Sequence, residues 1–405
     1  MWSLSLVLAC GGGEEDGPRD PSVPTITLPE GAPQACAHGP EVIVDTPAAY
    51  ERYIDEGLTR YTEVVAPNGH AIAIFAADGL SDAQILRARN LLRFYLEDVP
   101  DSRYGADKTA VADAMADNGA ALAMPNGAHR EGNEPRVNAQ PLYDAETPVA
   151  GSDWFMDNDF EHRDAAFEEI FHLVHDAGIG TYLPGALPDY QAELLAEAEA
   201  AIADGRWGIP VDPGVEDWLA DLEREGSLAQ EYIASVIDSY YGLWGPWTED
   251  DGGMWGIYIA KTRDEVLALD PVGHGLVEAF LAPNLTIEEP VDPDFDSTLS
   301  LVFNASEPYT HKTRYFQAVR LTGSGHVGIV GNALDNLFVS NAGDNALSGG
   351  EGDDTVVWCA DREDFEITLE GDTVVVESDT TGRDLLDGIE VLHFLDGAVA
   401  VSELE

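Results

Sequence analysis

The stretch G-N-A-L-D-N-L-F-V-S-N-A-G-D-N-A-L-S-G-G-E-G-D-D-T-V-V, residues 331–357, divides into three consecutive units of nine residues. Each unit opens with a small residue, carries Asn or Asp at its sixth position and has an apolar residue at its eighth. Glycine permits the positive φ that a tight turn requires. Carboxylate and turn carbonyl oxygens are the ligands that a hard cation such as calcium prefers. The pattern therefore predicts a turn-and-strand repeat whose apolar residues point inward and whose turns can hold calcium.

The third unit matches the nonapeptide G-G-x-G-x-D-x-U-x at every specified position and resembles the hemolysin-type (RTX) calcium repeats. This resemblance implies a short parallel β-roll over residues 325–357. The first two units have Asn where the motif has Asp, which suggests only one or two calcium ions; the alternative is a plain series of Gly/Asn turns. The residues implicated in calcium binding are Gly331, Asp335, Asn336, Gly343, Asn345, Gly349, Gly350, Gly352 and Asp354.

Residues 358–405 are rich in strand-forming residues, with predicted hairpins around Gly371 and around Asp396-Gly397. They resemble the β-rich cap that follows such repeats in secreted bacterial proteins. Before the repeats, residues 41–324 alternate helical and strand-like segments, which predicts an α+β domain. Within it we expect strands at 41–45, 70–75 and 120–124, and helices at 48–62, 81–96 and 107–118.

The N-terminus carries V-L-A-C at residues 7–10, which resembles a bacterial lipobox in which Cys10 is lipidated. The resemblance implies a lipoprotein-type signal over residues 1–10 and a location outside the cytoplasm: at the outer membrane, at the cell surface or secreted. The alternative is a chance cysteine after an apolar run. Residues 11–40 are rich in Gly, Pro and acidic residues and are expected to form a disordered tether. Cys36 and Cys359 could pair or stay free.

The charge balance excludes some partners. The chain of 405 residues has 76 acidic and 20 basic residues, a formal net charge of −56. Such a surface repels nucleic acid and anionic membranes, so any membrane contact is expected through the lipid anchor only. Calcium ions are natural partners for the same reason.

The segment D-A-A-F-E-E-I-F-H-L-V-H-D-A-G, residues 164–178, predicts an amphipathic helix, with Asp164 as N-cap and Gly178 at its end. Its polar face carries Glu168, Glu169, His172, His175 and Asp176. That face is either exposed to solvent or lines a metal site.

Written as Glu168-Glu169-x-x-His172, the segment resembles the zincin metallopeptidase motif H-E-x-x-H with its first His replaced by Glu. The resemblance implies Glu168 and His172 as zinc ligands and Glu169 as the general base that takes a proton from the attacking water. A Glu ligand would reduce the Lewis acidity of the metal. His175 is an alternative ligand or a supporting group.

The third ligand should come from a second helix, which we expect at residues 231–241 after a capping box at Ser227-x-x-Gln230. Glu231 in Q-E-Y-I-A is the candidate, because the sequence is similar to the E-[aromatic]-x-A of gluzincins. A nearby tyrosine could donate a hydrogen bond to an oxyanion, and the sequence leaves three open: Tyr232, Tyr240 and Tyr241.

The favoured hypothesis is a secreted or surface-anchored peptidase with a zincin-like α+β domain and a calcium β-roll. It would use calcium and zinc and act on a peptide or protein substrate. One alternative is a non-catalytic calcium-binding surface protein with a degenerate metallopeptidase-like domain. Another is a hydrolase that uses paired carboxylates such as Asp157 and Glu169; Asp159 and Glu161 in the same loop could also bind calcium or simply face solvent.

Overall fold

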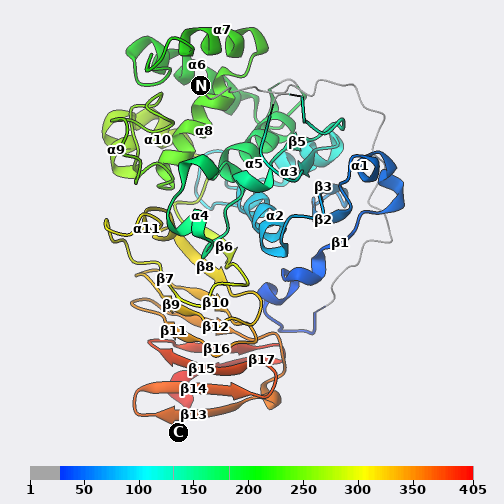
Figure 1. Cartoon of the computed structure of the whole chain (residues 1–405), viewed down its shortest axis with the longest axis vertical. Helices are drawn as coiled ribbons and strands as arrows, with labels where there is room; N and C mark the ends of the chain where they lie inside the picture. The colour runs from blue at the N-terminus through cyan, green and yellow to red at the C-terminus, as the bar shows by residue number, and fades with distance from the viewer. Residues whose placement is uncertain (1–27, 131, 182, 405) are drawn as a thin grey trace.

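The computed structural model describes residues 28–130, 132–181 and 183–404, and within them the chain is a mixed α/β protein with a β-rich C-terminal region (Figure 1). The N-terminal sheet has five strands in the order β1-β2-β3-β4-β5. These are β1 (Val44–Asp45), β2 (Arg60–Val65), β3 (Ala71–Ala76), β4 (Ala121–Met124) and β5 (Gln140–Pro141). The first two pairings are antiparallel and the last two parallel.

The prediction of a helix at residues 48–62 is wrong for the second half of that range. A short α1 (Glu51–Asp55) stops before Gly57, whose φ of 81° suits glycine. The chain then forms β2, which pairs with β3 as a hairpin. Tertiary pairing therefore overrides the local helical pattern. The strand expected at 41–45 is likewise reduced to the two residues of β1.

Helices pack beside this sheet and on one another. The capping box predicted at Ser81 and Gln84 is present and opens α2 (Asp82–Leu96). Helix α5 (Ala166–Val174) packs against both α2 and α8 (Leu228–Tyr240). The remaining helices are α3 (Thr109–Asp117), α4 (Asp153–Met156), α6 (Pro188–Asp204), α7 (Val215–Glu225), α9 (Arg263–Leu269), α10 (Pro271–Glu278) and α11 (Thr310–Thr313).

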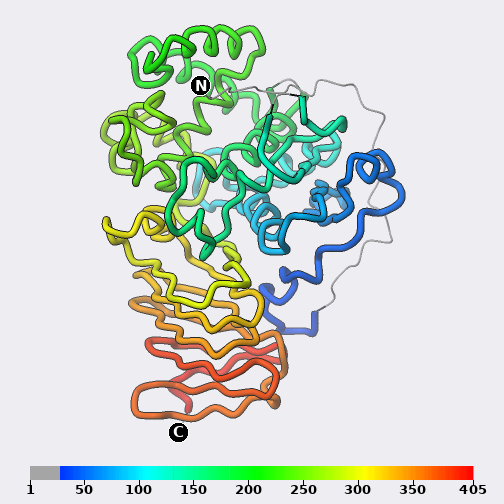
Figure 2. The backbone as a smooth tube through the Cα atoms, viewed as in Figure 1, coloured from blue at the N-terminus to red at the C-terminus, as the bar shows by residue number. Residues whose placement is uncertain are grey.

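The C-terminal region consists of two six-stranded sheets, ordered β17-β16-β12-β10-β8-β6 and β13-β14-β15-β11-β9-β7. Figure 2 shows the chain from yellow to red running back and forth in stacked turns. The strands are β6 (Leu285–Pro290), β7 (Thr298–Ser300), β8 (Phe316–Arg320), β9 (Gly328–Val330), β10 (Leu337–Val339), β11 (Ala346–Ser348), β12 (Thr355–Val357), β13 (Glu366–Glu370), β14 (Thr373–Ser378), β15 (Gly382–Asp387), β16 (Val391–Phe394) and β17 (Gly397–Ala400).

Successive strands of the repeats alternate between the two sheets, so each pairs in parallel with the strand two units away. Phe338 lies opposite Val356 in one sheet, and Ile329 lies opposite Leu347 in the other. These four eighth-position or equivalent side chains are buried, as the pattern predicts. The same alternation already begins at β6 and β7, well before residue 325. Both predicted hairpins are present, as β13–β14 and β16–β17.

The segment before β1 is not a free tether in the part that is described. Gln34–Ala37 form a 3-10 turn, and Cys36 forms a disulfide with Cys359. Ala35 and Cys36 also pack on Val339 and Val357 of the C-terminal sheets. Residues 1–27, including the predicted lipidation site Cys10, lie outside the described residues. Among the helices that are described, none is long and apolar enough to cross a membrane.

Candidate metal centre

Helix α5 is buried on all sides except along Glu169, so its polar residues do not form a solvent-facing stripe. Phe167, Ile170 and Phe171 lie in the core, as predicted. Asp164 does not cap the helix. Its carboxylate instead accepts two hydrogen bonds from Arg87 of α2, at 2.9 and 2.8 Å. The helix is thus positioned by a buried ion pair rather than by a capping side chain.

The α-helix also ends earlier than expected, and a π-helical turn, His175–Gly180, follows it. This wider turn places Gly178 against α3, where a Cβ would stand 2.7 Å from Val111 Cγ1. The side chain of His175 contacts α6, where its Nε2 lies 2.5 Å from Gln191 Oε1. Burial lowers the pKa of His175 to about 4. His175, the alternative ligand, is therefore not part of the cluster described next.

Three predicted ligands do come together. One ligand atom from each of Glu168, His172 and Glu231 lies within 4.8 Å of the other two, and all three residues are buried. His172 Nε2 faces Glu231 Oε1 at 3.6 Å. Glu168 and His172 are adjacent on α5 because they are four residues apart, and Glu231 reaches them from the first turn of α8.

The cluster is short of hydrogen-bond donors. In the described part of the chain, His172 Nε2 and both carboxylate oxygens of Glu231 have no hydrogen-bond partner. Buried polar atoms nearly always have one, and a missing partner costs about 1–3 kcal/mol. Three such atoms facing one another are a candidate site for a bound cation.

The electrostatics of the cluster point the same way. Burial disfavours a protonated His172, but Glu231, Glu169 and Glu168 outweigh it and raise the pKa of His172 to about 10. Burial also raises the pKa of Glu231. The shift of His172 reflects the negative charge around it, and that of Glu231 mainly the cost of burying a carboxylate; a positive ion or a proton relieves both.

Arg163 is a group of this site that the sequence reasoning missed. Its guanidinium bonds Glu168 Oε2 and also reaches Asp238 Oδ2 of α8 at 3.3 Å. Arg163 and His172 together lower the pKa of Glu168, against the effect of its burial. No spacing in the sequence marks Arg163, because it meets Asp238 only when α8 packs beside α5.

Glu169, the predicted general base, is the most exposed acid of the cluster, with a quarter of its side chain accessible. Its Oε2 accepts a hydrogen bond of 2.6 Å from Gln140 of β5 and lies 3.7 Å from His172 Nδ1. Glu169 is therefore beside the ligand cluster and open to water. Gln140 is a second residue that the sequence reasoning did not single out.

The tyrosines and the loop acids suggested by sequence have other partners. Tyr232 donates to Asp270, Tyr240 to Glu278 and Tyr241 to the carbonyl of Ala282, so none of the three hydroxyls is free for an oxyanion. The carboxylates considered in the loop around α4 are Asp157, which is exposed in the turn after the helix, Asp159, which pairs with His162 at 2.7 Å, and Glu161, which is exposed. The Asp157–Glu169 pair is not formed by any described contact, since the partner of Glu169 is Gln140.

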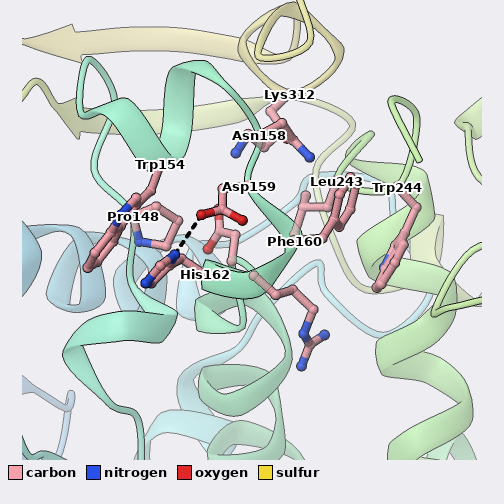
Figure 3. A pocket seen from close by; sticks show the side chains of 11 residues that line it. Pro148, Trp154, Asn158, Asp159, Phe160, His162, Leu243, Trp244 and Lys312 are labelled. Atoms are coloured by element: carbon pink, nitrogen blue, oxygen red, sulfur yellow. Dashed lines mark hydrogen bonds and ion pairs between the residues drawn. The ribbon is translucent and has the colours of Figure 1, made fainter. Parts of the chain in front are cut away.

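A pocket opens on the other side of Arg163, between α4 and the loop after α8 (Figure 3). Trp154 stacks on His162, with ring centroids 3.8 Å apart, and Trp244 stands on the opposite wall. Lys312 of α11 also lines the pocket. Arg163 lines this pocket and also bonds Glu168 of the ligand cluster.

The residues predicted to bind calcium lie in the turns between the short strands of the C-terminal sheets. Gly350 and Gly352 have φ of 107° and 123°, as the tight turn requires. Asp335 is a surface residue whose carboxylate accepts a hydrogen bond from Asp353 N. Asp354 is fully buried: its Oδ1 accepts a 2.7 Å hydrogen bond from Asn336 N, and its Oδ2 has no partner in the described structure.

Comparison with known proteins leaves the family open. No protein-family model matches the chain, and none of the curated proteins matches its sequence. Among solved structures, the chain is similar to the extracellular lipase LipA from Serratia marcescens at 22% sequence identity, with a TM-score of 0.16. The matched region covers 18% of this chain and 15% of the lipase chain, so the likeness concerns a small part of either protein.

Proposed function

We propose that this protein is a metal-dependent peptidase whose C-terminal β-roll is stabilised by calcium. The observation that carries the proposal is the buried cluster of Glu168, His172 and Glu231, in which three polar atoms lack partners among the described residues. These are residues that the motif resemblance implies as ligands, and they come from two separate helices. A structural role in packing alone gives no reason for leaving such atoms without hydrogen bonds.

The donor set suits zinc. Zinc accepts imidazole nitrogen and carboxylate oxygen at about 2.0–2.2 Å, so two ligands of a tetrahedral ion stand roughly 3.4 Å apart. The distance of 3.6 Å between His172 Nε2 and Glu231 Oε1 agrees with this spacing. Glu168 would complete a three-residue set, and a fourth position would remain for water or substrate, as in catalytic sites.

Zinc, when bound, supplies a Lewis acid that polarises a carbonyl group and lowers the pKa of water. Glu169 acts as the general base: its partly exposed carboxylate can take a proton from the attacking water and pass it to the departing amine. Gln140 donates to Glu169 Oε2 and holds this carboxylate beside the ligand cluster. Arg163 balances the charge of Glu168 and limits how strongly that carboxylate binds the metal.

Two further features support an extracytoplasmic protein. The Cys36–Cys359 disulfide is of the kind that persists in oxidising compartments. The parallel strands at intervals of nine residues, with Asp354 buried in a turn, are the arrangement expected of a calcium-stabilised β-roll. Lipidation at Cys10 would add a membrane anchor, and the substrate class is a peptide or protein.

A second candidate function is a non-catalytic calcium-binding surface protein. The ion pair between Arg163 and Glu168 favours it, because a positive side chain already satisfies one of the three ligands. In that case the cluster would be a metal site that has been replaced by an internal salt bridge.

Metal analysis of the purified protein separates the two candidates. A peptidase should retain about one zinc ion per chain after dialysis. It should lose the ion in Glu168→Ala and His172→Ala but keep it in Glu161→Ala, which changes an exposed acid in the loop before α5. Casein hydrolysis should be abolished by Glu169→Gln with the metal retained. A protein that binds calcium alone and hydrolyses no peptide, with or without added zinc, would contradict the proposal.

A further inference from the structure

The third nine-residue unit differs from both of the others at two positions that change together. The second and sixth residues are Asn332 and Asn336 in the first unit and Asn341 and Asn345 in the second. In the third unit the same two positions hold Gly350 and Asp354. A pair of amides is thus exchanged for a glycine and a carboxylate.

In the second unit the side-chain amide of Asn345 is buried among oxygen atoms. Its Nδ2 lies 3.0 Å from Asn341 Oδ1, 3.0 Å from the carbonyl of Gly343 and 2.8 Å from Asp384 Oδ1. The hydroxyl of Ser340 stands at 3.2 Å. A set of carboxylate, amide and carbonyl oxygens around one point is what calcium normally takes as ligands. Here an N–H donor of the protein already occupies that point.

The first unit repeats the arrangement with fewer partners. Asn336 Nδ2 donates to Asn332 Oδ1 at 3.2 Å and approaches the carbonyl of Gln317 at 3.4 Å. Asn336 Oδ1 in turn accepts from Asn332 N at 3.0 Å. The side-chain amides of each pair are therefore hydrogen-bonded to one another and to neighbouring turns or strands.

The third unit has no amide to fill the equivalent place. Gly350 contributes no side chain, and Asp354 presents a buried Oδ2 that lacks a partner among the described residues. The carbonyl oxygen of Gly388 lies beside it: a Cβ on Gly349 would stand 2.1 Å from that oxygen and 2.2 Å from Asp354 Oδ2. The carboxylate of Glu390 is also nearby, because it accepts a hydrogen bond of 2.7 Å from Asp354 N. Oxygen ligands and negative charge converge here, and no described donor reaches Asp354 Oδ2.

We infer that Asn336 and Asn345 replace the cation in the first two units with their own amide nitrogens, and that a single calcium site remains, at Asp354. The inference rests on the calcium binding proposed above for the third unit. It removes Asn336 and Asn345 from the set of calcium ligands. It also means that the turns of the first two units are held by side-chain hydrogen bonds, and that calcium secures only the turn of the third.

The test exchanges the two patterns in the full-length chain. Asn341→Gly/Asn345→Asp copies the third unit into the second, and Gly350→Asn/Asp354→Asn copies the first two units into the third. Asp354→Asn alone is a second, smaller change, and circular dichroism checks that each variant folds. After treatment with chelator, calcium chloride is titrated in excess magnesium, which suppresses weak binding to the acidic surface.

The wild-type protein should bind one tight calcium ion in the C-terminal region, and both Asp354 variants should bind none there. Asn341→Gly/Asn345→Asp should gain an ion. Without calcium its melting temperature should fall below that of the wild type, because the new carboxylate faces Asp384, and added calcium should restore it.

Two results would overturn the inference: a wild-type protein that binds two or more tight ions in this region, or an Asn341→Gly/Asn345→Asp variant that folds but gains none. A third result would count against the proposed function as well. If the wild type binds no calcium while that variant does, the calcium site at Asp354 and the calcium stabilisation of the natural chain both fail, and only the amide replacement stands.

Discussion

Arg163 joins two buried carboxylates, Glu168 and Asp238, and is the charged group nearest to the candidate ligands that is not itself a ligand. Arg163→Met would remove the guanidinium that contacts both carboxylates and leave Glu168 with His172 as its cationic neighbour. Removing one partner of a buried ion pair costs about 3–5 kcal/mol, so the metal-free variant should be that much less stable in urea unfolding. Zinc should raise its melting temperature more than that of the wild type, because Glu168 becomes fully available. A variant as stable as the wild type in chelator would contradict this role.

Lys108 gives a prediction about pH. Its ammonium group is buried, donates to the carbonyl of Tyr95 at 3.0 Å and lies 4.3 Å from the centre of the Phe280 ring. Burial lowers the pKa of Lys108 to about 7, with Glu97 and Asp98 acting in the opposite direction. The unfolded chain, with a lysine pKa of about 10.4, then binds more protons than the folded chain between pH 7 and about pH 10.4.

The contribution of Lys108 to stability should therefore rise with pH in this window, by up to about 1.4 kcal/mol per pH unit. Lys108→Met removes the titrating group, so its unfolding free energy should increase less between pH 7.5 and pH 9.5 than that of the wild type. Urea unfolding of both proteins at several pH values, at constant calcium, measures the difference. Equal slopes would show that Lys108 keeps an ordinary titration in the folded state.

Among single residues, the sequence predicts those members of the site whose placement depends on local spacing. Glu168 and His172 share a face because they are four residues apart, and Glu231 was found because Q-E-Y-I-A resembles a known helix sequence. Arg163 and Gln140 could not be found, since their partners are set by how α8 and β5 pack beside α5. The three candidate tyrosines in and after α8 were wrong for the same reason: their hydroxyls donate to Asp270, Glu278 and the carbonyl of Ala282.

Three elements meet at one buried charge cluster, which orients the helix that carries the candidate ligands. Arg87 of α2 contacts both Asp164, just before α5, and Glu289 of β6, at 2.8 and 3.3 Å. Arg87→Leu would remove the guanidinium that contacts the buried carboxylates of Asp164 and Glu289, and should lower the free energy of unfolding by about 3–5 kcal/mol. The control is Arg103→Leu: Arg103 also makes two hydrogen bonds to one carboxylate, Glu193, but its side chain is 63% exposed.

An exposed pair contributes about 0–1 kcal/mol, so the two substitutions should differ by several kcal/mol in chemical denaturation. Arg87→Leu should also weaken zinc retention, since α5 loses its anchor. Similar losses for Arg87→Leu and Arg103→Leu would mean that burial adds nothing to this pair.

Among the elements, prediction succeeds where local signals agree with long-range packing. The capping box at Ser81 is present, whereas Ser227, with the same motif, makes no capping hydrogen bond. Asp164 has the right chemistry for an N-cap but is taken by Arg87, seventy-seven positions away in the chain. The π-helical turn after α5 arises from the approach to α3 and has no signature in the segment itself.

For the molecule as a whole, the nonapeptide period correctly indicates strands nine residues apart, but it places the beginning of the β-rich region too late. β6 and β8 pair in parallel although no repeat motif covers them. The two sheets therefore extend beneath the helical part, and β6 contacts α2 directly. Only the sequences of the tight turns are constrained enough to be recognised, and strands linked by longer connections carry no such mark.

The disulfide between Cys36 and Cys359 joins residues 323 positions apart and holds the N-terminal segment on the C-terminal sheets (Figure 2). A cross-link that closes so long a loop restricts the unfolded chain strongly, and removing a native disulfide typically costs about 2–5 kcal/mol. Cys36→Ala/Cys359→Ala should therefore lower the melting temperature, and a reducing agent should do the same to the wild type but not to the variant. Metal content should be unchanged, because the disulfide lies at the C-terminal sheets and not in α5 or α8, which carry the candidate ligands.

Limited proteolysis adds a spatial test of the same cross-link. Cleavage within residues 28–42 should be faster in the variant, because only non-covalent contacts would then hold the segment. These are the hydrogen bond from Arg320 to the carbonyl of Ala35 and the packing of Ala35. Equal cleavage in both proteins would mean that these non-covalent contacts suffice.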